Sequence, residues 1–244
     1  MLTTNWPVPI AMHLCPSASE INPVLSRVFQ AMRAAALLEK DLADTAVPKK
    51  FYASDDKLLH RVDLPEFTQL IQFFADAIQK TVGAANAGIW PQGKMSLQLE
   101  IMGCWFQIQN GMAFHDVYTH GNYSWSGVYY VQIDEAKKRM DHPEIGKVNG
   151  GTRFYGPYSQ WQGGSHMDIG NSYLQKNSLD IHLEEGKLVY LLPIFRIWPC
   201  LMRVRKIESL FLLMYKYIQH RVIKYLALIL NKSLNTQNYV LWKI

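Results

Sequence analysis

The spacing of the apolar residues changes once along the chain, and this change limits the fold more than any other feature. Over residues 21–35 and 67–78 apolar side chains recur every three or four positions, as the buried face of a helix requires. From residue 97 onward they alternate with other residues, which is the pattern of half-buried strands. Helices followed by several short strands predict an α+β domain containing an antiparallel barrel or sandwich.

Two helices are expected in the first part of the chain. Ser17 and Glu20 have the spacing of a capping box, and the apolar pattern after them predicts a helix to about residue 44. A second helix is expected from Pro65 to Thr81, with Gly83 just past its end. The apolar face of this second helix contains Phe67, Leu70, Ile71, Phe74 and Ile78.

Several strands are expected after residue 96. The alternation over residues 97–101 resumes over residues 106–108 with its parity shifted by one, and a bulge near Gly103 explains that shift. Turn-rich segments separate the later candidates. These further strands are expected at Trp125 to Ile133, Thr152 to Tyr155 and Lys187 to Tyr190.

Size and composition exclude several classes of protein. The chain has 244 residues, of which 49% are hydrophobic, so it can bury a sizeable core and is neither disordered nor collagen-like. Its three cysteines, Cys15, Cys104 and Cys200, form no CxxC pair, which argues against a disulfide framework or a zinc knuckle. This cysteine usage favours a reducing compartment, and with no signal peptide recognised we expect a cytoplasmic protein.

The last 54 residues differ in composition from the rest. Residues 191–244 contain 9 basic and 1 acidic side chains, net +8, whereas residues 1–190 contain 16 basic and 19 acidic ones, net −3. The tail has no glycine and no aspartate, the residues on which turns depend, so it is unusual for part of a compact domain.

This difference in net charge bears on two classes of partner, membranes and nucleic acids. The most apolar run, Ile207 to Leu230, is interrupted by charged residues, so no transmembrane span is expected, but an amphipathic helix on a membrane surface stays an alternative. No nucleic-acid partner is expected, because the first 190 residues are net acidic.

One segment contains candidate metal ligands. His115 and His120 lie in FHDVYTHGNYSWSGVYYV, beside Asp116 and just before an expected strand. An iron site of two histidines and one carboxylate needs such groups at a rigid strand end. A histidine near a strand is more often a hydrogen-bonded structural residue, so both interpretations stay open. Ser126, in the same segment, lacks the nucleophile-elbow pattern and is interpreted as an ordinary strand residue, and Cys104 as a small buried hydrophobe.

Five segments together resemble a family of 2-oxoglutarate- and Fe(II)-dependent oxygenases. The resemblance covers roughly residues 6 to 190 and is specific, because distinct motifs occur in the right order. It implies N-terminal helices packed on a double-stranded β-helix, or jelly roll, which here lacks its last core strands. We therefore expect an incomplete oxygenase-like domain over residues 1–190 and a helical or disordered tail over 191–244. The segments are WFQIQNG (105–111), FHDVYTHGNYSWSGVYYVQID (114–134), GGTRFYGPY (150–158), DIGNSYL (168–174) and DIHLEEGKLV (180–189).

The resemblance also implies cofactors and site residues. Family members bind Fe(II) through an early pair of ligands and a distal histidine, and an arginine holds 2-oxoglutarate, to hydroxylate a C–H bond of a substrate that is unknown for this chain. The motif HxHGN puts its second histidine at His120 and its first at Tyr118, with His115 as a substitute ligand. Asn122 and Tyr130 are the implied 2-oxoglutarate-binding residues, and no further catalytic residue is assigned.

After Tyr190 the resemblance continues only in another reading frame. In this second frame, each codon consists of the last base of one residue's codon and the first two bases of the next. Read in this way, the codons for Leu191 to Tyr217 can encode PSYLSHLALPYAGEKDRIVISFNVQV. This sequence contains the family's histidine and arginine. Degenerate codons leave freedom at many junctions, but Trp198 before Pro199 forces alanine.

This second frame suggests that a single-base insertion or deletion near codons 189 and 190 shifted the reading frame. The chain as written is then expected to have little or no turnover. The alternatives are a non-catalytic jelly roll that binds a ligand and a membrane-surface protein that uses its basic tail.

Overall fold

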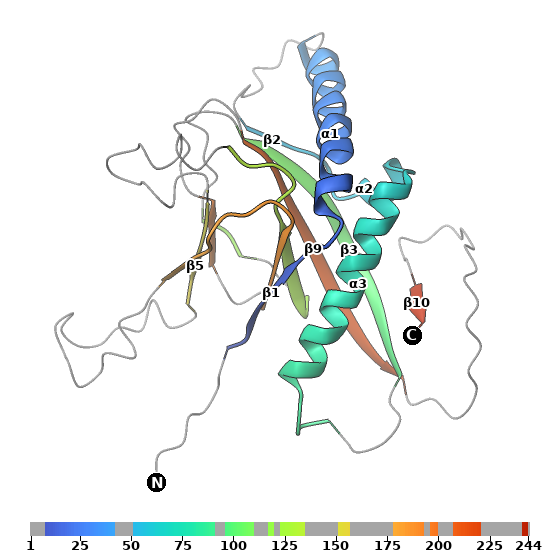
Figure 1. Cartoon of the computed structure of the whole chain (residues 1–244), viewed down its shortest axis with the longest axis vertical. Coiled ribbons are helices and arrows are strands. Elements are labelled where there is room, and N and C mark those ends of the chain that lie inside the picture. The colour runs from blue at the N-terminus through green and yellow to red at the C-terminus, as the bar shows by residue number, and fades with distance from the viewer. Residues whose placement is uncertain are drawn as a thin grey trace, which may run out of the picture.

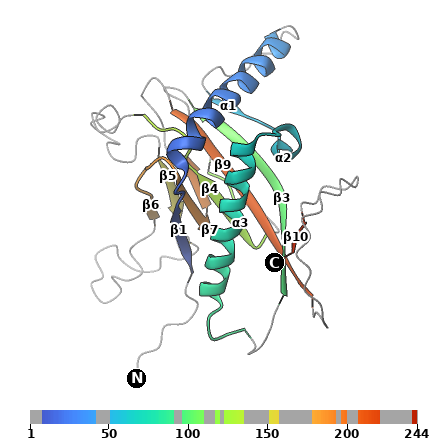
Figure 2. The ribbon, with the colours of Figure 1, turned by 45° about the vertical axis from the view of Figure 1, so that its right-hand side comes forward.

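The computed structural model describes residues 8–41, 51–90, 96–109, 117–119, 123–134, 151–156, 178–192, 196–199, 207–220 and 241–243. The described elements form three layers, in which helices cover one face of a seven-stranded sheet and a three-stranded sheet covers the other (Figures 1 and 2). Helices packed against antiparallel sheets agree with the predicted α+β class.

The first helix begins where the capping-box pattern predicts. In α1 (Ala18–Asp41) the amides of Glu20 and Ile21 donate to the Ser17 carbonyl at 3.1 and 3.0 Å. Residues 42–44, to which the prediction extended, lie outside the described residues. A short helix, α2 (Leu58–Arg61), was not predicted.

The third helix is one turn longer than predicted. α3 (Pro65–Ala85) continues through Gly83, which was expected just beyond its end. The extra turn is stabilised because Val82 is buried in the core and its carbonyl accepts a 2.9 Å hydrogen bond from Asn86 Nδ2.

All strand pairs of the larger sheet are antiparallel, in the order β1, β7, β4, β9, β3, β10, with β2 paired to the end of β3. Their bounds are β1 (Ile10–Leu14), β2 (Phe51–Ala53), β3 (Ser96–Gln109), β4 (Trp125–Tyr129), β7 (Lys187–Leu191), β9 (Ile207–His220) and β10 (Leu241–Lys243). The smaller sheet has the order β6 (Ser178–Asp180), β5 (Thr152–Tyr155), β8 (Arg196–Pro199).

All four predicted strands are present, one of them with unchanged bounds. The bulge expected near Gly103 is confirmed, because the register of β3 against β9 shifts between Ile101 and Gly103. The strand expected to reach Ile133 ends at Tyr129, and the Ile133 amide bonds to the Glu185 carboxylate at 3.0 Å instead of to a strand. β5 and β7 lie where the alternation predicted them.

The expectation of a helical or disordered tail is wrong for the described tail residues, which form β8, β9 and β10. β9 pairs with β3 on one side and β4 on the other, so the larger sheet continues past residue 190. β9 contains an uninterrupted apolar run from Leu210 to Met214 and has a central place in the sheet. The membrane-surface helix proposed for 207–230 therefore does not form over 207–220, and residues 221–230 lie outside the described residues. The division of the chain at residue 190 stays a prediction.

The helices pack on the larger sheet through buried apolar side chains and two hydrogen bonds from tyrosines. The hydroxyl of Tyr129 donates to Asn22 Oδ1 on α1 at 2.8 Å, and that of Tyr190 donates to the Phe74 carbonyl on α3 at 2.9 Å. Cys104 lies in the same core with no exposed surface, and burial raises the pKa of its thiol, so its interpretation as a buried hydrophobe is confirmed.

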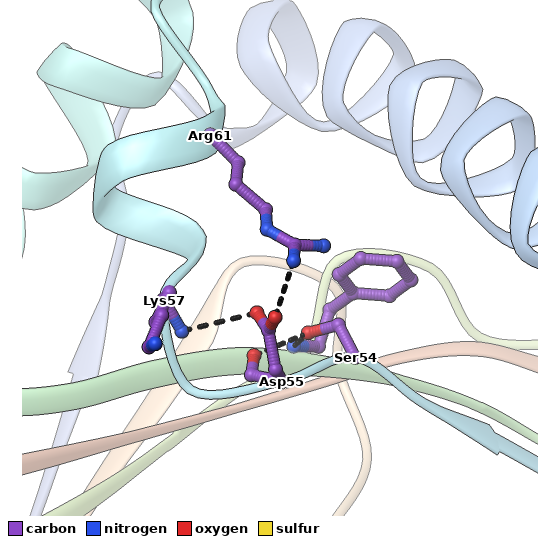
Figure 3. A network of polar contacts seen from close by, with 5 residues as sticks. Ser54, Asp55, Lys57 and Arg61 are labelled. Carbon is purple, nitrogen blue, oxygen red and sulfur yellow. Dashed lines mark hydrogen bonds and ion pairs between the residues drawn. The ribbon is translucent and has the colours of Figure 1, made fainter.

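The segment between β2 and α2 is fixed to β3 by a small polar network (Figure 3). The Ser54 amide donates to the Phe106 carbonyl at 3.0 Å, and the Phe106 amide donates to Ser54 Oγ at 3.1 Å. The Asp55 carboxylate accepts a hydrogen bond from the Lys57 amide at 3.2 Å and forms an ion pair with Arg61 at 2.5 Å.

Within the described part of the chain, none of the helices is both long and apolar enough to cross a membrane.

Candidate ligand site between the two sheets

The space between the two sheets is lined by one face of β4 and β7 and by the opposing smaller sheet. Because side chains alternate along a strand, Val128 and Tyr130 point into this space, whereas Trp125 and Tyr129 pack toward the helices. None of the buried side chains in this inter-sheet cluster is more than 5% exposed, and they are Val128, Tyr130, Phe154, Ile181, Leu183, Val189 and Leu191.

One hydrogen bond crosses the interior from sheet to sheet. The hydroxyl of Tyr130 donates to Thr152 Oγ1 at 2.9 Å, and both residues are buried. A hydroxyl that accepts one bond can still donate another, so the Thr152 proton is left for an acceptor. The predicted site residue Tyr130 therefore lies in the interior, next to a threonine that the sequence did not single out.

Tyr118 lies against the same inter-sheet cluster. Burial, with a smaller contribution from Tyr130, raises the pKa of the Tyr118 phenol, so this side chain is neutral at physiological pH. The structure thus brings together two residues from opposite ends of one sequence motif. Burial alone therefore favours the neutral phenol over the phenolate at this position.

The other predicted site residues cannot be placed. His115, His120 and Asn122 lie outside the described residues and stay predictions. Among the residues that the structure does describe, no three His, Cys, Asp or Glu side chains converge as a metal site requires. The described residues alone therefore do not make an iron site.

Ser126 is a buried polar residue whose importance the sequence did not reveal. It has no exposed surface, and it lies at the same parity as Val128 and Tyr130, so it faces the inter-sheet space. Its opposite residue on β7 is the buried Leu191. Within the described part of the chain, no group forms a hydrogen bond with the Ser126 hydroxyl. The sequence signal was a polar residue at an inward position of a strand.

Arg153 lies next to Thr152 in the sequence, but its side chain does not face the interior. Arg153 lies on β5 between Thr152 and Phe154, which both point inward, so its side chain belongs to the outer face. There it forms two hydrogen bonds with Asp180, at 2.6 and 2.9 Å. It is therefore engaged on the outer face and does not serve a carboxylate between the sheets.

Comparison with known proteins gives matches to solved structures only, since neither a protein-family model nor a curated protein matches the chain. A prolyl-4-hydroxylase from Pseudomonas putida is 14% identical, with 86% of this chain and 93% of that chain covered and a TM-score of 0.43. An oxidoreductase of the 2-oxoglutarate-Fe(II) oxygenase family from Burkholderia pseudomallei is 12% identical, with 85% and 84% covered and a TM-score of 0.44.

A third similar structure is the epimerase SnoN in complex with Fe3+, α-ketoglutarate and nogalamycin RO. It is 10% identical, with 96% of this chain and 94% of that chain covered and a TM-score of 0.48. Two of these three similar structures are thus described with both iron and 2-oxoglutarate. TM-scores below 0.5 do not by themselves establish a common fold, so the residues of this chain must support any functional conclusion.

Proposed function

We propose that this chain has the scaffold of a 2-oxoglutarate- and Fe(II)-dependent dioxygenase and, as written, has little or no turnover. The observation that supports this most is the packing of the partly buried Tyr118 against the inter-sheet cluster that contains the buried Tyr130. Both belong to the motif segment 114–134 that resembles the oxygenase family, and the resemblance assigns both to the site.

The residues available for the cofactors differ for the two groups. The Thr152 hydroxyl, which Tyr130 leaves free to donate, is suited to a carboxylate of 2-oxoglutarate. For iron, the neutral phenol of Tyr118 replaces the expected first histidine, and the described residues offer no complete ligand set. The proposal therefore includes binding of the cosubstrate but no catalytic step at a metal.

The tail is the main reason to expect no turnover. After Tyr190 the first histidine of the chain is His220, whereas codons for residues 191–217 can encode the family's distal histidine and arginine in the shifted frame. Loss of a residue that merely orients a ligand costs about 10- to 100-fold in metal affinity or activity, and loss of a ligand itself costs more.

Succinate formation from 2-oxoglutarate with added Fe(II) tests the proposal for the chain as written. We expect no succinate above the level without enzyme, because a complete ligand set is missing. Robust 2-oxoglutarate-dependent succinate formation by the 244-residue chain would contradict the proposed inactivity.

The Thr152 hydroxyl, which accepts the Tyr130 hydrogen bond in a buried interior, supports the cosubstrate binding that this proposal includes. We expect 2-oxoglutarate to raise the thermal denaturation midpoint of the chain, because a ligand that binds only the folded state stabilises it. An unchanged midpoint at millimolar 2-oxoglutarate, with and without Mn(II), would argue against this binding.

A further inference from the structure

We infer that the hydroxyl of Ser126 donates a hydrogen bond to a carboxylate of a dicarboxylic acid bound between the two sheets. This inference rests on the proposed function, because 2-oxoglutarate is the dicarboxylic acid expected there. It assigns a role to a residue that neither the motif resemblance nor the metal-ligand pattern had singled out.

The position of Ser126 supports contact with a bound ligand. It lies on β4, six residues after the candidate metal ligand His120 in the sequence, and it faces the same interior as Tyr130. The inward side chains next to it, Val128 along the strand and Leu191 across to β7, are apolar and supply no acceptor.

A buried hydroxyl without a partner is unfavourable for the fold alone. Alanine would occupy almost the same space without the cost of desolvating the hydroxyl, so packing gives no reason to keep the serine oxygen. A ligand carboxylate would satisfy it, and hydrogen bonds to a charged acceptor are the stronger ones. The donor also suits a site where Arg153 is engaged elsewhere, on the outer face.

The test compares Ser126→Ala with Ser26→Ala in the full chain. Ser26 is a second buried serine, but it lies on α1 and its hydroxyl already donates to Gln132 Oε1 at 2.6 Å. The measurements are thermal denaturation without ligand and titration with 2-oxoglutarate in the presence of Mn(II).

Ser126→Ala is expected to keep or raise the denaturation midpoint without ligand and to weaken 2-oxoglutarate binding by about 10- to 100-fold. Ser26→Ala is expected to lower the midpoint and leave the affinity unchanged, because it removes a structural hydrogen bond far from the ligand. Ser126→Cys, which keeps the size but donates weakly, is expected to bind as weakly as the alanine variant.

The possible failures can be told apart. If the unaltered chain does not bind 2-oxoglutarate, the proposed function fails and this inference fails with it. If the unaltered chain binds and Ser126→Ala binds equally well, only the role of Ser126 is overturned. A large loss of stability in ligand-free Ser126→Ala would reveal a structural hydrogen bond and would also overturn it.

Discussion

Gly127 is a residue at which the packing beneath the helices leaves no room for a side chain. A Cβ atom added there would lie 2.7 Å from Cε1 of Tyr190, a fully buried ring whose hydroxyl bonds to α3. We therefore expect Gly127→Ala to lower the free energy of unfolding by about 1–3 kcal/mol, the usual cost of overpacking a core. Urea denaturation measures this change, and a variant as stable as the parent would show that the ring can move aside.

His13 gives the chain a pH dependence that can be assigned to one residue. Thr81 Oγ1 donates to the Ala77 carbonyl, so the 2.8 Å contact between His13 Nε2 and Thr81 Oγ1 has the imidazole as donor. Burial, and then the charge of Lys80, lower the pKa of His13. The charged form is therefore less favoured in the folded chain than in the unfolded one.

The sign of this effect follows from linkage. Because the folded pKa lies below the unfolded value of about 6.5, the unfolded state binds more protons near pH 6. The contribution of His13 to stability is fully present above the unfolded pKa of about 6.5. It is lost as the pH falls from there through the lower pKa of the folded chain. We expect urea midpoints at pH 7.5 and 5.5 to differ less in His13→Gln than in the parent chain, and an equal difference would exclude His13 as the cause.

Functional assignment at the residue scale was only partly accessible from the sequence. Tyr118 and Tyr130 could be named because they belong to a recognisable motif, and they lie in one interior. Thr152 and Ser126 could not, because a hydroxyl at an inward strand position is meaningful only when its hydrogen-bond partners are known.

Among the elements, α3 offers a stabilising substitution. Gly83 lies inside the helix, and a Cβ atom added there would meet no atom within 4 Å. Gly83→Ala should raise the free energy of unfolding by about 0.5–1 kcal/mol, since glycine in a helix interior is less favourable than alanine by that amount. This variant is the matched control for Gly127→Ala, because the same substitution is expected to have opposite signs at the two positions. A destabilised Gly83→Ala chain would show that the helix does not extend past this residue.

The elements with long, regular apolar patterns were predictable, and so were the short strands β5 and β7, but the three-residue strands and the four-residue helix α2 were not. α1, α3 and the bulged β3 could be predicted because helical or alternating spacing extends over many residues. β2 and β6 have three residues each, too few to show a period. The sequence of β9 contains an uninterrupted apolar run, Leu210 to Met214, and periodicity alone cannot distinguish such a run from part of a buried helix.

At the scale of the whole molecule, the tail determines both the completeness of the sheet and the chemistry of the site. β9 lies between β3 and β4, so the backbone of residues 207–220 of the tail occupies the centre of the larger sheet. Codons for the tail, read one base out of phase, can encode the histidine and the arginine that the resemblance implies. The proposed inactivity thus follows from side chains missing from the tail, with the scaffold retained.

The most direct test of this account restores the second reading frame. A variant in which residues 191–217 are replaced by PSYLSHLALPYAGEKDRIVISFNVQV is compared with the parent chain for succinate formation from 2-oxoglutarate and Fe(II), each with and without Tyr118→His. We predict no turnover by the parent chain, with or without Tyr118→His, and turnover by the restored chain that carries Tyr118→His. Succinate formation by the parent chain would contradict the proposed inactivity. The reading-frame hypothesis would be contradicted if the restored chain with Tyr118→His folds and binds 2-oxoglutarate but forms no succinate.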